Sequence, residues 1–311
     1  MTANQISGGS RLCLATVTTD SFVPGTLVMI YSFLKHNKGF TGDIVIICDE
    51  LSVQSREFLS DLYEKISFLE VSEQLKDRVG RITRVFPEFA KKKARYYSIE
   101  AVRLSDYKKV LFCDSDFLFR RSIEDLFELP NPLIACGDGF HYQGREREWP
   151  VPVDDQGSAE NRTALYSNTW SSGLILIDET FLTGETYDGL LALVDHRMYE
   201  THRTELTDQM IFNIFFSGQQ HLVSAKYNYP LTHRVSIEKK EGLSPTEARA
   251  LHFNGPVKPW NIERVLVASQ RDPAYIKAAE FWYDCYIECL QNLYLRKEMS
   301  SRNGIESMSS N

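Results

Sequence analysis

Short apolar runs recur along the chain and are separated by segments with helical periodicity. Five runs of four to six residues are continuously apolar rather than alternating, and they lie at Leu12–Val17, Ile44–Cys48, Val110–Cys113, Leu133–Cys136 and Leu174–Ile177. Runs of this length and pattern are typical of strands that are buried on both faces of a sheet.

Two segments between the runs have the spacing of amphipathic helices. The first opens with Pro24, which suits a first helical turn, and its apolar stripe consists of Leu27, Ile30, Tyr31 and Leu34. The second steps by four, three, four and three residues from Ala90 to Leu104. Strands that alternate with helices predict an α/β domain with a mainly parallel sheet. Ligands bind at the carboxyl ends of the strands in such sheets, so the residues directly after each run are candidates for a site.

We expect one domain over residues 11–300, between a flexible N-terminus at 1–10 and a disordered tail at 301–311. Residues 137–168 are polar and contain Gly, Pro and acidic pairs, which is typical of a lid, a binding loop or a locally disordered segment.

A C-terminal helix is expected over residues 272–297, where Asp272 and Pro273 suit an N-cap and a first helical residue. Its apolar residues fall on one face, which we expect to dock on the domain itself, with weak peripheral contact to a membrane as the alternative. That face consists of Trp282, Cys285, Cys289 and Leu293.

Composition and charge exclude several classes of protein. With 43% hydrophobic and 25% charged residues, the 311-residue chain has the make-up of an ordinary globular protein. Its net charge of −7 argues against nucleic acid as a partner. No run approaches the roughly 18 apolar residues that span a bilayer, and no basic and apolar leader opens the chain. Six cysteines without a Cys-x-x-Cys pair indicate buried, reduced thiols, and we expect a cytoplasmic protein.

Two carboxylates follow the third apolar run. Asp114 and Asp116 flank Ser115, and if the extended geometry continues, both aspartate side chains face one ligand. Paired hard oxygens suit Mg²⁺ or Mn²⁺, either of which neutralises a diphosphate. Taken alone, an Asp-x-Asp pair is weak, and a solvated turn after a strand is an equal alternative.

A second cluster of polar residues lies in the decapeptide Leu251–Trp260. It combines His252, Gly255 and Lys258. Histidine is a normal third ligand for Mn²⁺, glycine permits close approach of the backbone, and lysine supplies a charge for phosphate. A single histidine would more often be a surface or core residue, so the interpretation depends on the whole decapeptide.

A basic run precedes the second helical stripe. Lys91–Arg95 opens that helix, where positive charge opposes the helix dipole. A solvated face is the ordinary explanation, but contact with a phosphate would account for the unfavourable position. We favour Lys93 or Arg95 for that contact.

In this order, the motifs resemble those of glycosyltransferase family 8, from about Leu12 to about Trp260. The similar blocks are Ala15–Thr19 with Val23–Val28, Lys93–Arg95 with Tyr107–Asp116, Trp170–Gly173, Thr207–Asn213, and His252, Gly255 and Lys258. The resemblance implies the GT-A fold, which is a single Rossmann-like domain with a mixed, mainly parallel sheet flanked by helices. It also implies retaining transfer of a hexosyl unit from a UDP-sugar, with UDP-glucose or UDP-galactose favoured. The acceptor would be a hydroxyl of a carbohydrate, a protein or a small molecule.

The resemblance also implies roles for individual residues. Asp114, Asp116 and His252 would bind Mn²⁺, with Mg²⁺ as the alternative. Asp208 and Gln209 would orient the sugar and stabilise an oxocarbenium-like centre, although Asp208 could also be an ordinary helix N-cap. The nucleotide-sugar contacts would be Ala15, Thr16, Val17, Lys93, Arg95, Asp114, Ser115, Asp116, Ser171, Gly255 and Lys258.

Two details of the resemblance concern the sugar and the acceptor. Ser171 stands where the family has asparagine, so contacts to the donor sugar are expected to differ. Residues 137–168 would form the acceptor side, with a wall that includes Phe140, His141, Tyr142 and Trp149.

Two other functions fit parts of the pattern. A phosphohydrolase of the haloacid dehalogenase type also places Asp-x-Asp after a strand. That family has the motif near its start with Thr or Val two residues on, whereas here Phe117 and Leu118 follow it. A catalytically inactive nucleotide-sugar-binding protein on the same fold is the other alternative, against which the intact metal and Asp208-Gln209 elements argue.

Overall fold

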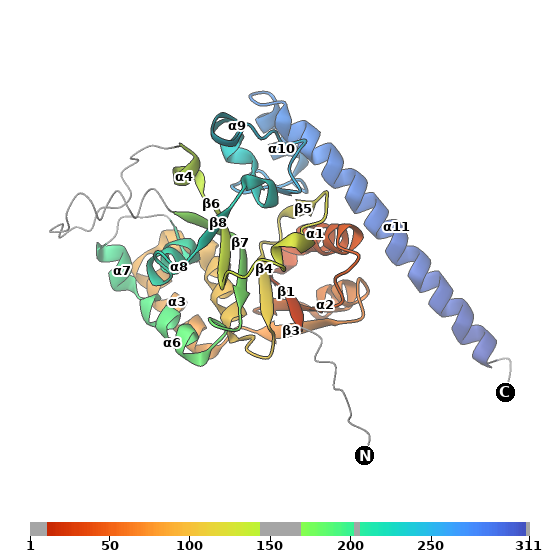
Figure 1. The fold of residues 1–311 in the computed structure, drawn as a ribbon. Coiled ribbons are helices and arrows are strands. Elements are labelled where there is room, and N and C mark those ends of the chain that lie inside the picture. The colour runs from red at the N-terminus through yellow and green to blue at the C-terminus, as the bar shows by residue number, and fades with distance from the viewer. Residues whose placement is uncertain (1–10, 144–168, 202–205, 309–311) are drawn as a thin grey trace, which may run out of the picture.

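The computed structural model describes residues 11–143, 169–201 and 206–308, and its centre is a seven-stranded sheet. The strands lie in the order β3-β2-β1-β4-β7-β6-β8 (Figure 1). Their bounds are β1 Leu12–Thr18, β2 Asp43–Cys48, β3 Ile66–Glu70, β4 Lys109–Cys113, β6 Leu133–Gly137, β7 Trp170–Asp178 and β8 His221–Val223. A second sheet of three short strands contains β5 Phe117–Phe119, β10 Ala250–His252 and β9 Tyr229–Pro230.

The large sheet is mixed and mainly parallel, as predicted. β1 pairs in parallel with both β2 and β4, and β2–β3 and β6–β8 are also parallel. Only β7 runs against its neighbours in this sheet, since it is antiparallel to β4 and to β6. Each of the five predicted apolar runs lies inside one of these strands. The strands that the pattern did not predict are the half-exposed β3 and four strands of two or three residues, which are too short to show a period.

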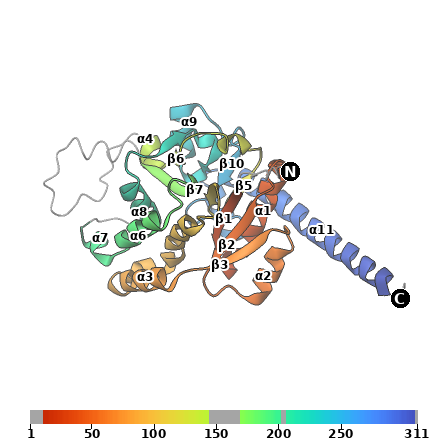
Figure 2. The same cartoon turned by 60° about the horizontal axis from the view of Figure 1, so that its bottom comes forward.

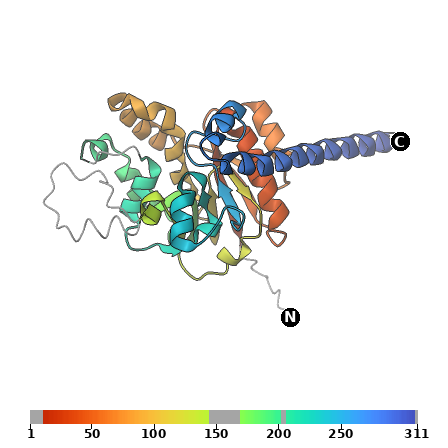
Figure 3. The same ribbon diagram turned by 90° about the horizontal axis from the view of Figure 1, so that it is seen from above.

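Helices cover both faces of the sheet. Their bounds are α1 Val23–His36, α2 Val53–Ser60, α3 Glu73–Val85, α4 Gly139–Gln143, α6 Gly184–Leu193, α7 His196–Thr201, α8 Asp208–Phe215, α9 Arg234–Glu241, α10 Ile262–Ser269 and α11 Ala274–Met308. Short 3-10 helices lie at Asp20–Phe22, Glu124–Leu126, Ala225–Tyr227 and Leu231–His233. Figures 2 and 3 show α1 and α2 on one side of the sheet and α3, α6 and α8 on the other.

Successive residues of a central strand enter opposite cores. Val110 and Phe112 of β4 pack in the core that α3, α6 and α8 cover, and Leu111 and Cys113 pack in the core beneath α1 and α2. This arrangement follows from the period of two along a strand. It explains why the run is apolar throughout, because neither face of β4 meets water.

The second predicted helix winds differently from the expectation. Residues Pro87–Arg103 form a long 3-10 helix, η2, instead of an α-helix, although Tyr97 and Ala101 are buried as the stripe implies. An apolar spacing of three and four residues places side chains on one face in either kind of helix, so the pattern could not distinguish them.

Helix α11 packs through the predicted face and then continues beyond it. Asp272 accepts a hydrogen bond from the Ala274 amide at its start, and the face of Trp282, Cys285, Cys289 and Leu293 is buried. The helix extends to Met308, past residue 300, where we expected a disordered tail to begin. Its last fifteen residues contain no proline and a single glycine, so nothing in them stops a helix. Figure 1 shows this end projecting from the body of the molecule.

Some expectations concern segments outside the described part of the chain, and two others can be compared with the structure. The N-terminus at 1–10, most of the 137–168 loop with Trp149, and residues 309–311 lie outside the described residues. All six cysteines are buried free thiols, as predicted. Among the described residues, no helix is long and apolar enough to cross a membrane.

Candidate active site

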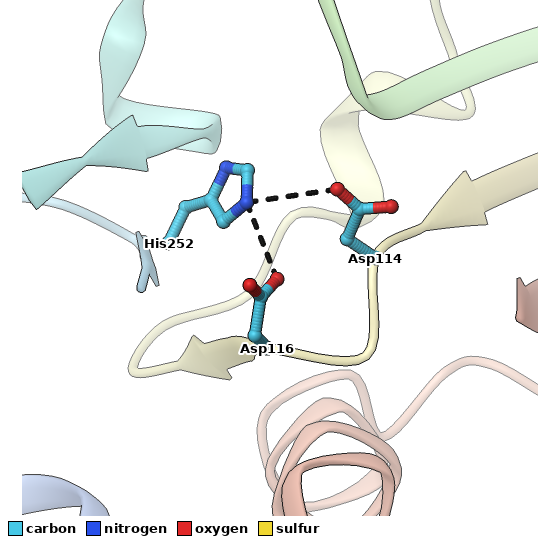
Figure 4. A group of neighbouring side chains, drawn as sticks. All are labelled: Asp114, Asp116 and His252. Carbon is cyan, nitrogen blue, oxygen red and sulfur yellow. Dashed lines mark ion pairs between the residues drawn. The ribbon is translucent and has the colours of Figure 1, made fainter. Parts of the chain in front are cut away.

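The two aspartates and the distant histidine meet at the carboxyl end of β4, the central strand of the large sheet. Asp114 and Asp116 lie between β4 and β5, and His252 ends β10, which pairs antiparallel with β5. The pairing places His252 opposite Phe117, the residue after Asp116. The Nε2 atom of His252 is 3.2 Å from Oδ1 of Asp116 and 3.6 Å from Oδ2 of Asp114. Figure 4 shows all three side chains pointing toward one another.

A hydrogen bond and a ring contact fix the orientation of His252. Its Nδ1 atom is 2.9 Å from Oδ1 of Asn228, and its ring stacks on Phe117 with a 4.3 Å centroid separation. Because an amide oxygen can only accept, Nδ1 is the donor in this contact, and Nε2 is the ring nitrogen that faces the carboxylates. Sequence reasoning missed Asn228, which follows no apolar run and belongs to no motif.

Glycine is required at two positions around these residues. A Cβ on Gly173 of β7 would lie 2.6 Å from Cε1 of His252 and 3.0 Å from Oδ2 of Asp114. A Cβ on Gly25 of α1 would lie 2.6 Å from the carbonyl oxygen of Ser115 and 2.6 Å from the ring of Trp260. Any larger residue would push β7 or α1 away from the aspartates.

The two aspartates have opposite electrostatic environments. Partial removal from water and the neighbouring Asp116 carboxylate raise the pKa of Asp114, whose side chain is 43% exposed, to about 7. Burial also opposes ionisation of Asp116, but the Lys258 ammonium and the His252 imidazole outweigh it and lower the pKa of Asp116. Lys258 donates hydrogen bonds to Oδ2 of Asp116 and, at 2.7 Å, to the carbonyl oxygen of Phe253.

This donor set fits a divalent metal ion. One ligand atom from each of Asp114, Asp116 and His252 lies within 4.8 Å of the others. Oδ1 of Asp116 is buried, and beyond its 3.2 Å contact with Nε2 of His252 it has no hydrogen-bond partner among the described residues, which is costly unless a cation meets it. Two carboxylate oxygens and an imidazole nitrogen are ligands that Mn²⁺ accepts.

Asp208 lies beside these residues and is held by hydroxyl groups. It is the first residue of α8, and Thr207 occupies the N-cap position, so the alternative of Asp208 as the N-cap is wrong. Its carboxylate accepts hydrogen bonds from Thr207 Oγ1 at 2.8 Å and from Ser98 Oγ at 3.0 Å. Burial raises the pKa of Asp208 in spite of the hydroxyls, among them that of Ser172, that lower it. Because Ser172 precedes Gly173, the same part of β7 contacts both Asp208 and the candidate metal ligands.

Gln209 is tied to a carboxylate that sequence reasoning also missed. Its Nε2 donates to Oδ2 of Asp138 at 2.9 Å. Asp138 is 4% exposed, and burial raises its pKa although several hydrogen bonds lower it. It directly follows β6, so the rule of inspecting the end of each apolar run could have found it, but it was assigned to the 137–168 loop.

The residues expected to contact the base lie in β1, and those expected to contact the phosphates lie in η2. Ala15 and Thr16 are buried within β1, and Val17 is half-buried nearer its carboxyl end. Lys93 lies on the side of Asp49, with its Nζ 3.7 Å from Oδ2. Arg95 is exposed, and its charge lowers the pKa of Asp208 in part, so the structure separates these two basic residues.

Three other residues were expected to contact the nucleotide-sugar, namely Ser171, Ser115 and Gly255. Ser171 Oγ accepts from the Gly173 amide at 3.2 Å, and Ser115 is buried. Gly255 has a φ of +81°, a conformation that glycine adopts without strain, and it turns the chain between His252 and Lys258.

Comparison with known proteins agrees with this geometry. Residues 13–263 match the family described as Glycosyl transferase family 8. Glycogenin-1 of Mus musculus is 24% identical over 302 residues, covering 91% of this chain and 79% of its own, and the uncharacterized protein R707 of Acanthamoeba polyphaga mimivirus is 22% identical, covering 85% and 89%. The structure of the galactosyltransferase LgtC with donor and acceptor sugar analogs superposes with a TM-score of 0.64 at 17% identity, over 89% of this chain and 95% of LgtC. The chain therefore belongs to glycosyl transferase family 8.

Proposed function

We propose that the protein transfers a hexosyl unit from a UDP-sugar to an acceptor hydroxyl, with Mn²⁺ and with retention at the anomeric carbon. The observation that carries the proposal is the convergence of Asp114, Asp116 and His252 around a buried oxygen of Asp116 that, beyond its contact with His252, has no hydrogen-bond partner among the described residues. Membership of the family supports the reaction class, and UDP-glucose and UDP-galactose are the donors we favour.

The metal-binding residues and Lys258 would act on the leaving group. Held by Asp114, Asp116 and His252, Mn²⁺ would offset the negative charge that develops on the UDP diphosphate. Lys258 lies on Asp116 and would add a second positive charge to the phosphates. His252 would bind the metal ion through Nε2, because Oδ1 of Asn228 is the acceptor for its other ring nitrogen.

The sugar would lie beside Asp208 and Gln209. Asp208 already accepts hydrogen bonds from Thr207 and Ser98, so it is rigidly placed rather than free to swing. Its negative charge and the amide of the half-buried Gln209 would face the positive charge that develops at the anomeric carbon. The acceptor would approach from the side of residues 137–143.

Release of UDP tests this function without knowledge of the acceptor. We expect slow, Mn²⁺-dependent UDP release from UDP-glucose or UDP-galactose, which a chelator stops. Asp116→Ala should abolish the release because it removes a ligand and leaves Lys258 without its partner. Asp188→Ala, which changes an exposed aspartate on α6, should keep full activity and serves as the matched control.

Two results would contradict the proposal. Liberation of inorganic phosphate from phosphomonoesters would favour the haloacid dehalogenase chemistry. Tight binding of UDP with no release from either sugar nucleotide, even with a library of acceptors, would favour an inactive nucleotide-sugar-binding protein.

A further inference from the structure

Both carboxylate oxygens of Asp138 accept hydrogen bonds. Its Oδ1 atom accepts three hydrogen bonds, from the amides of Phe140 and His141 at 3.0 Å each and from Thr169 Oγ1 at 2.7 Å. The two amides belong to the first turn of α4, so Oδ1 caps this helix. Oδ2 takes no part in the cap and accepts from Nε2 of Gln209 instead.

The backbone that carries Asp138 is clamped between two imidazole rings. A Cβ on Gly137 would lie 2.3 Å from Cδ2 of His141, and a Cβ on Gly139 would lie 2.5 Å from Cε1 of His233. These approaches are closer than real Cβ atoms make, so a side chain at either position would have to displace an imidazole ring. The carboxylate therefore has little freedom to move toward or away from Gln209.

The backbone of Gln209 is anchored as firmly on the other side. Its carbonyl oxygen accepts from Nδ2 of Asn213 at 2.7 Å. Asn213 in turn exchanges two hydrogen bonds with the backbone of Trp170, at 3.0 and 2.8 Å, which fastens α8 to the start of β7. With its backbone anchored, the position of the Gln209 amide depends on the side-chain torsion angles. The hydrogen bond to Asp138 fixes these angles.

A carboxylate can only accept hydrogen bonds, so it pairs with the NH2 end of the Gln209 amide and not with the oxygen end. With Nε2 turned to Asp138, the Oε1 atom of Gln209 lies on the other side of the planar group, away from Asp138. A charge-assisted bond to nitrogen also increases the electron density on the amide oxygen. Gln209 is half-buried and directly follows Asp208, whose carboxylate contacts Ser172 beside the candidate metal ligands.

We propose that Asp138 is a positioning residue that turns the amide oxygen of Gln209 toward the donor sugar. This inference rests on the proposed function, and it adds that Gln209 acts through its oxygen rather than through its N–H groups. The oxygen would meet the positive charge that develops at the anomeric carbon, whereas a flipped amide would present hydrogens to it.

Asp138→Asn separates this role from that of a helix cap. Asparagine caps a helix as well as aspartate does, so α4 and the free energy of unfolding should be retained. The new amide presents a donor to Gln209, whose own amide must then flip. We expect kcat for UDP release to fall about 100-fold, the order of effect that a misplaced group produces, with the KM for the donor and the Mn²⁺ affinity unchanged.

A double substitution supplies the rescue. In Asp138→Asn with Gln209→Glu, the new carboxylate accepts from the new amide, so an oxygen again faces the sugar. We expect kcat at least about tenfold above that of Asp138→Asn alone, which is within the range of coupling between residues in contact. Asp272→Asn is the matched control, because Asp272 also caps a helix with one oxygen and accepts from Arg234 with the other, and it should leave kcat unchanged.

A readout without turnover keeps the two proposals apart. In the nitrogen-15 spectrum, the side-chain amide of Gln209, assigned by its loss in Gln209→Glu, should exchange slowly in the wild type and quickly in Asp138→Asn. If the wild type releases no UDP, the proposed function fails while this spectrum still tests the amide orientation. Fast exchange in the wild type, or a normal kcat in Asp138→Asn, would overturn the positioning role.

Discussion

Asp114 and Asp116 are chemically identical side chains that differ in what surrounds them. Asp116 is paired with Lys258 and faces His252, so its charged form is favoured. Asp114, by contrast, meets the repulsion of Asp116, which Lys258 and His252 offset only in part. Below pH 7 Asp114 is therefore the member of the pair that is mainly protonated, and a metal ion bound there would have to displace that proton.

The affinity for Mn²⁺ should consequently depend on pH. Below the pKa of Asp114, which is raised to about 7, each metal ion that binds releases one proton. The affinity should thus fall by about tenfold for each pH unit below 7 and level off above it. Isothermal titration calorimetry in buffers with different ionisation enthalpies measures both the affinity and the released proton. In Asp114→Asn this one-proton dependence should disappear, and an unchanged dependence would assign the proton to another group.

At the scale of elements, the site depends on how closely three segments approach one another. β7 brings Gly173 against both His252 and Asp114, and the Gly173 carbonyl oxygen also accepts from the Asp114 amide at 2.9 Å. β10 reaches the same point only through its pairing with β5. A single methyl group between these elements would separate the ligands without touching their chemistry.

Gly173→Ala should therefore impair metal binding more than folding. We expect the Mn²⁺ affinity to fall by about 10–100-fold, the range seen when groups that orient metal ligands are disturbed. Gly80→Ala is the matched control, since a Cβ there meets nothing within 4 Å in the middle of α3. That control should bind Mn²⁺ normally and should raise the free energy of unfolding by about 0.5–1 kcal/mol. Equal Mn²⁺ affinity in the two variants would refute the packing argument.

The sequence reveals residues with a chemical signature better than it reveals their supports. Asp114 and Asp116 stood out as candidates because few residue types bind a hard cation and because they follow an apolar run, and His252 stood out only together with Gly255 and Lys258 in its decapeptide. Asn228 and Asp138 could not be predicted in their roles, since an amide or a carboxylate in a loop has many ordinary uses. Their function depends on partners that lie far away in the sequence, which only the folded chain brings together.

The prediction of strands and helices from the sequence was limited in a similar way. The runs that became β1, β2, β4, β6 and β7 were predictable because burial on both faces leaves no polar position in them. β5 and β10 are three residues each and have no detectable period, yet their pairing is what delivers His252. The 3-10 winding of η2 was missed for a related reason. Apolar spacing shows which side chains share a helix face, but not which residues the backbone hydrogen bonds join.

For the whole molecule, α11 is the element that joins the far end of the chain to the first helix. Cys289 and Leu293 pack in the core beside α1, and Trp282 lies 5.9 Å from Trp260, centre to centre. Trp260 in turn contacts the backbone of α1 at Gly25. The helix thus supports the wall behind the aspartates without supplying a residue to them.

Stability and activity should therefore separate along α11. Leu293→Ala removes a side chain that is 5% exposed and should lower the free energy of unfolding by about 2–5 kcal/mol. Leu295→Ala, at a side chain that is 54% exposed, should change it by less than about 0.5 kcal/mol. Urea unfolding followed by tryptophan fluorescence gives both values. Folded samples of either variant should release UDP at the wild-type rate, and a slowed Leu293→Ala enzyme would instead place α11 in the catalytic machinery.

The short β5–β10 pair links regions that leave the ribosome at very different times. Asp116 and β5 are synthesised long before His252, so the histidine can reach the aspartates only after most of the chain has been made and folded. Affinity for the metal ion would then arise late in biogenesis and would be absent from partly folded chains. A cell that supplies Mn²⁺ would stabilise the finished molecules selectively, since a ligand that binds only the native state shifts the equilibrium toward it.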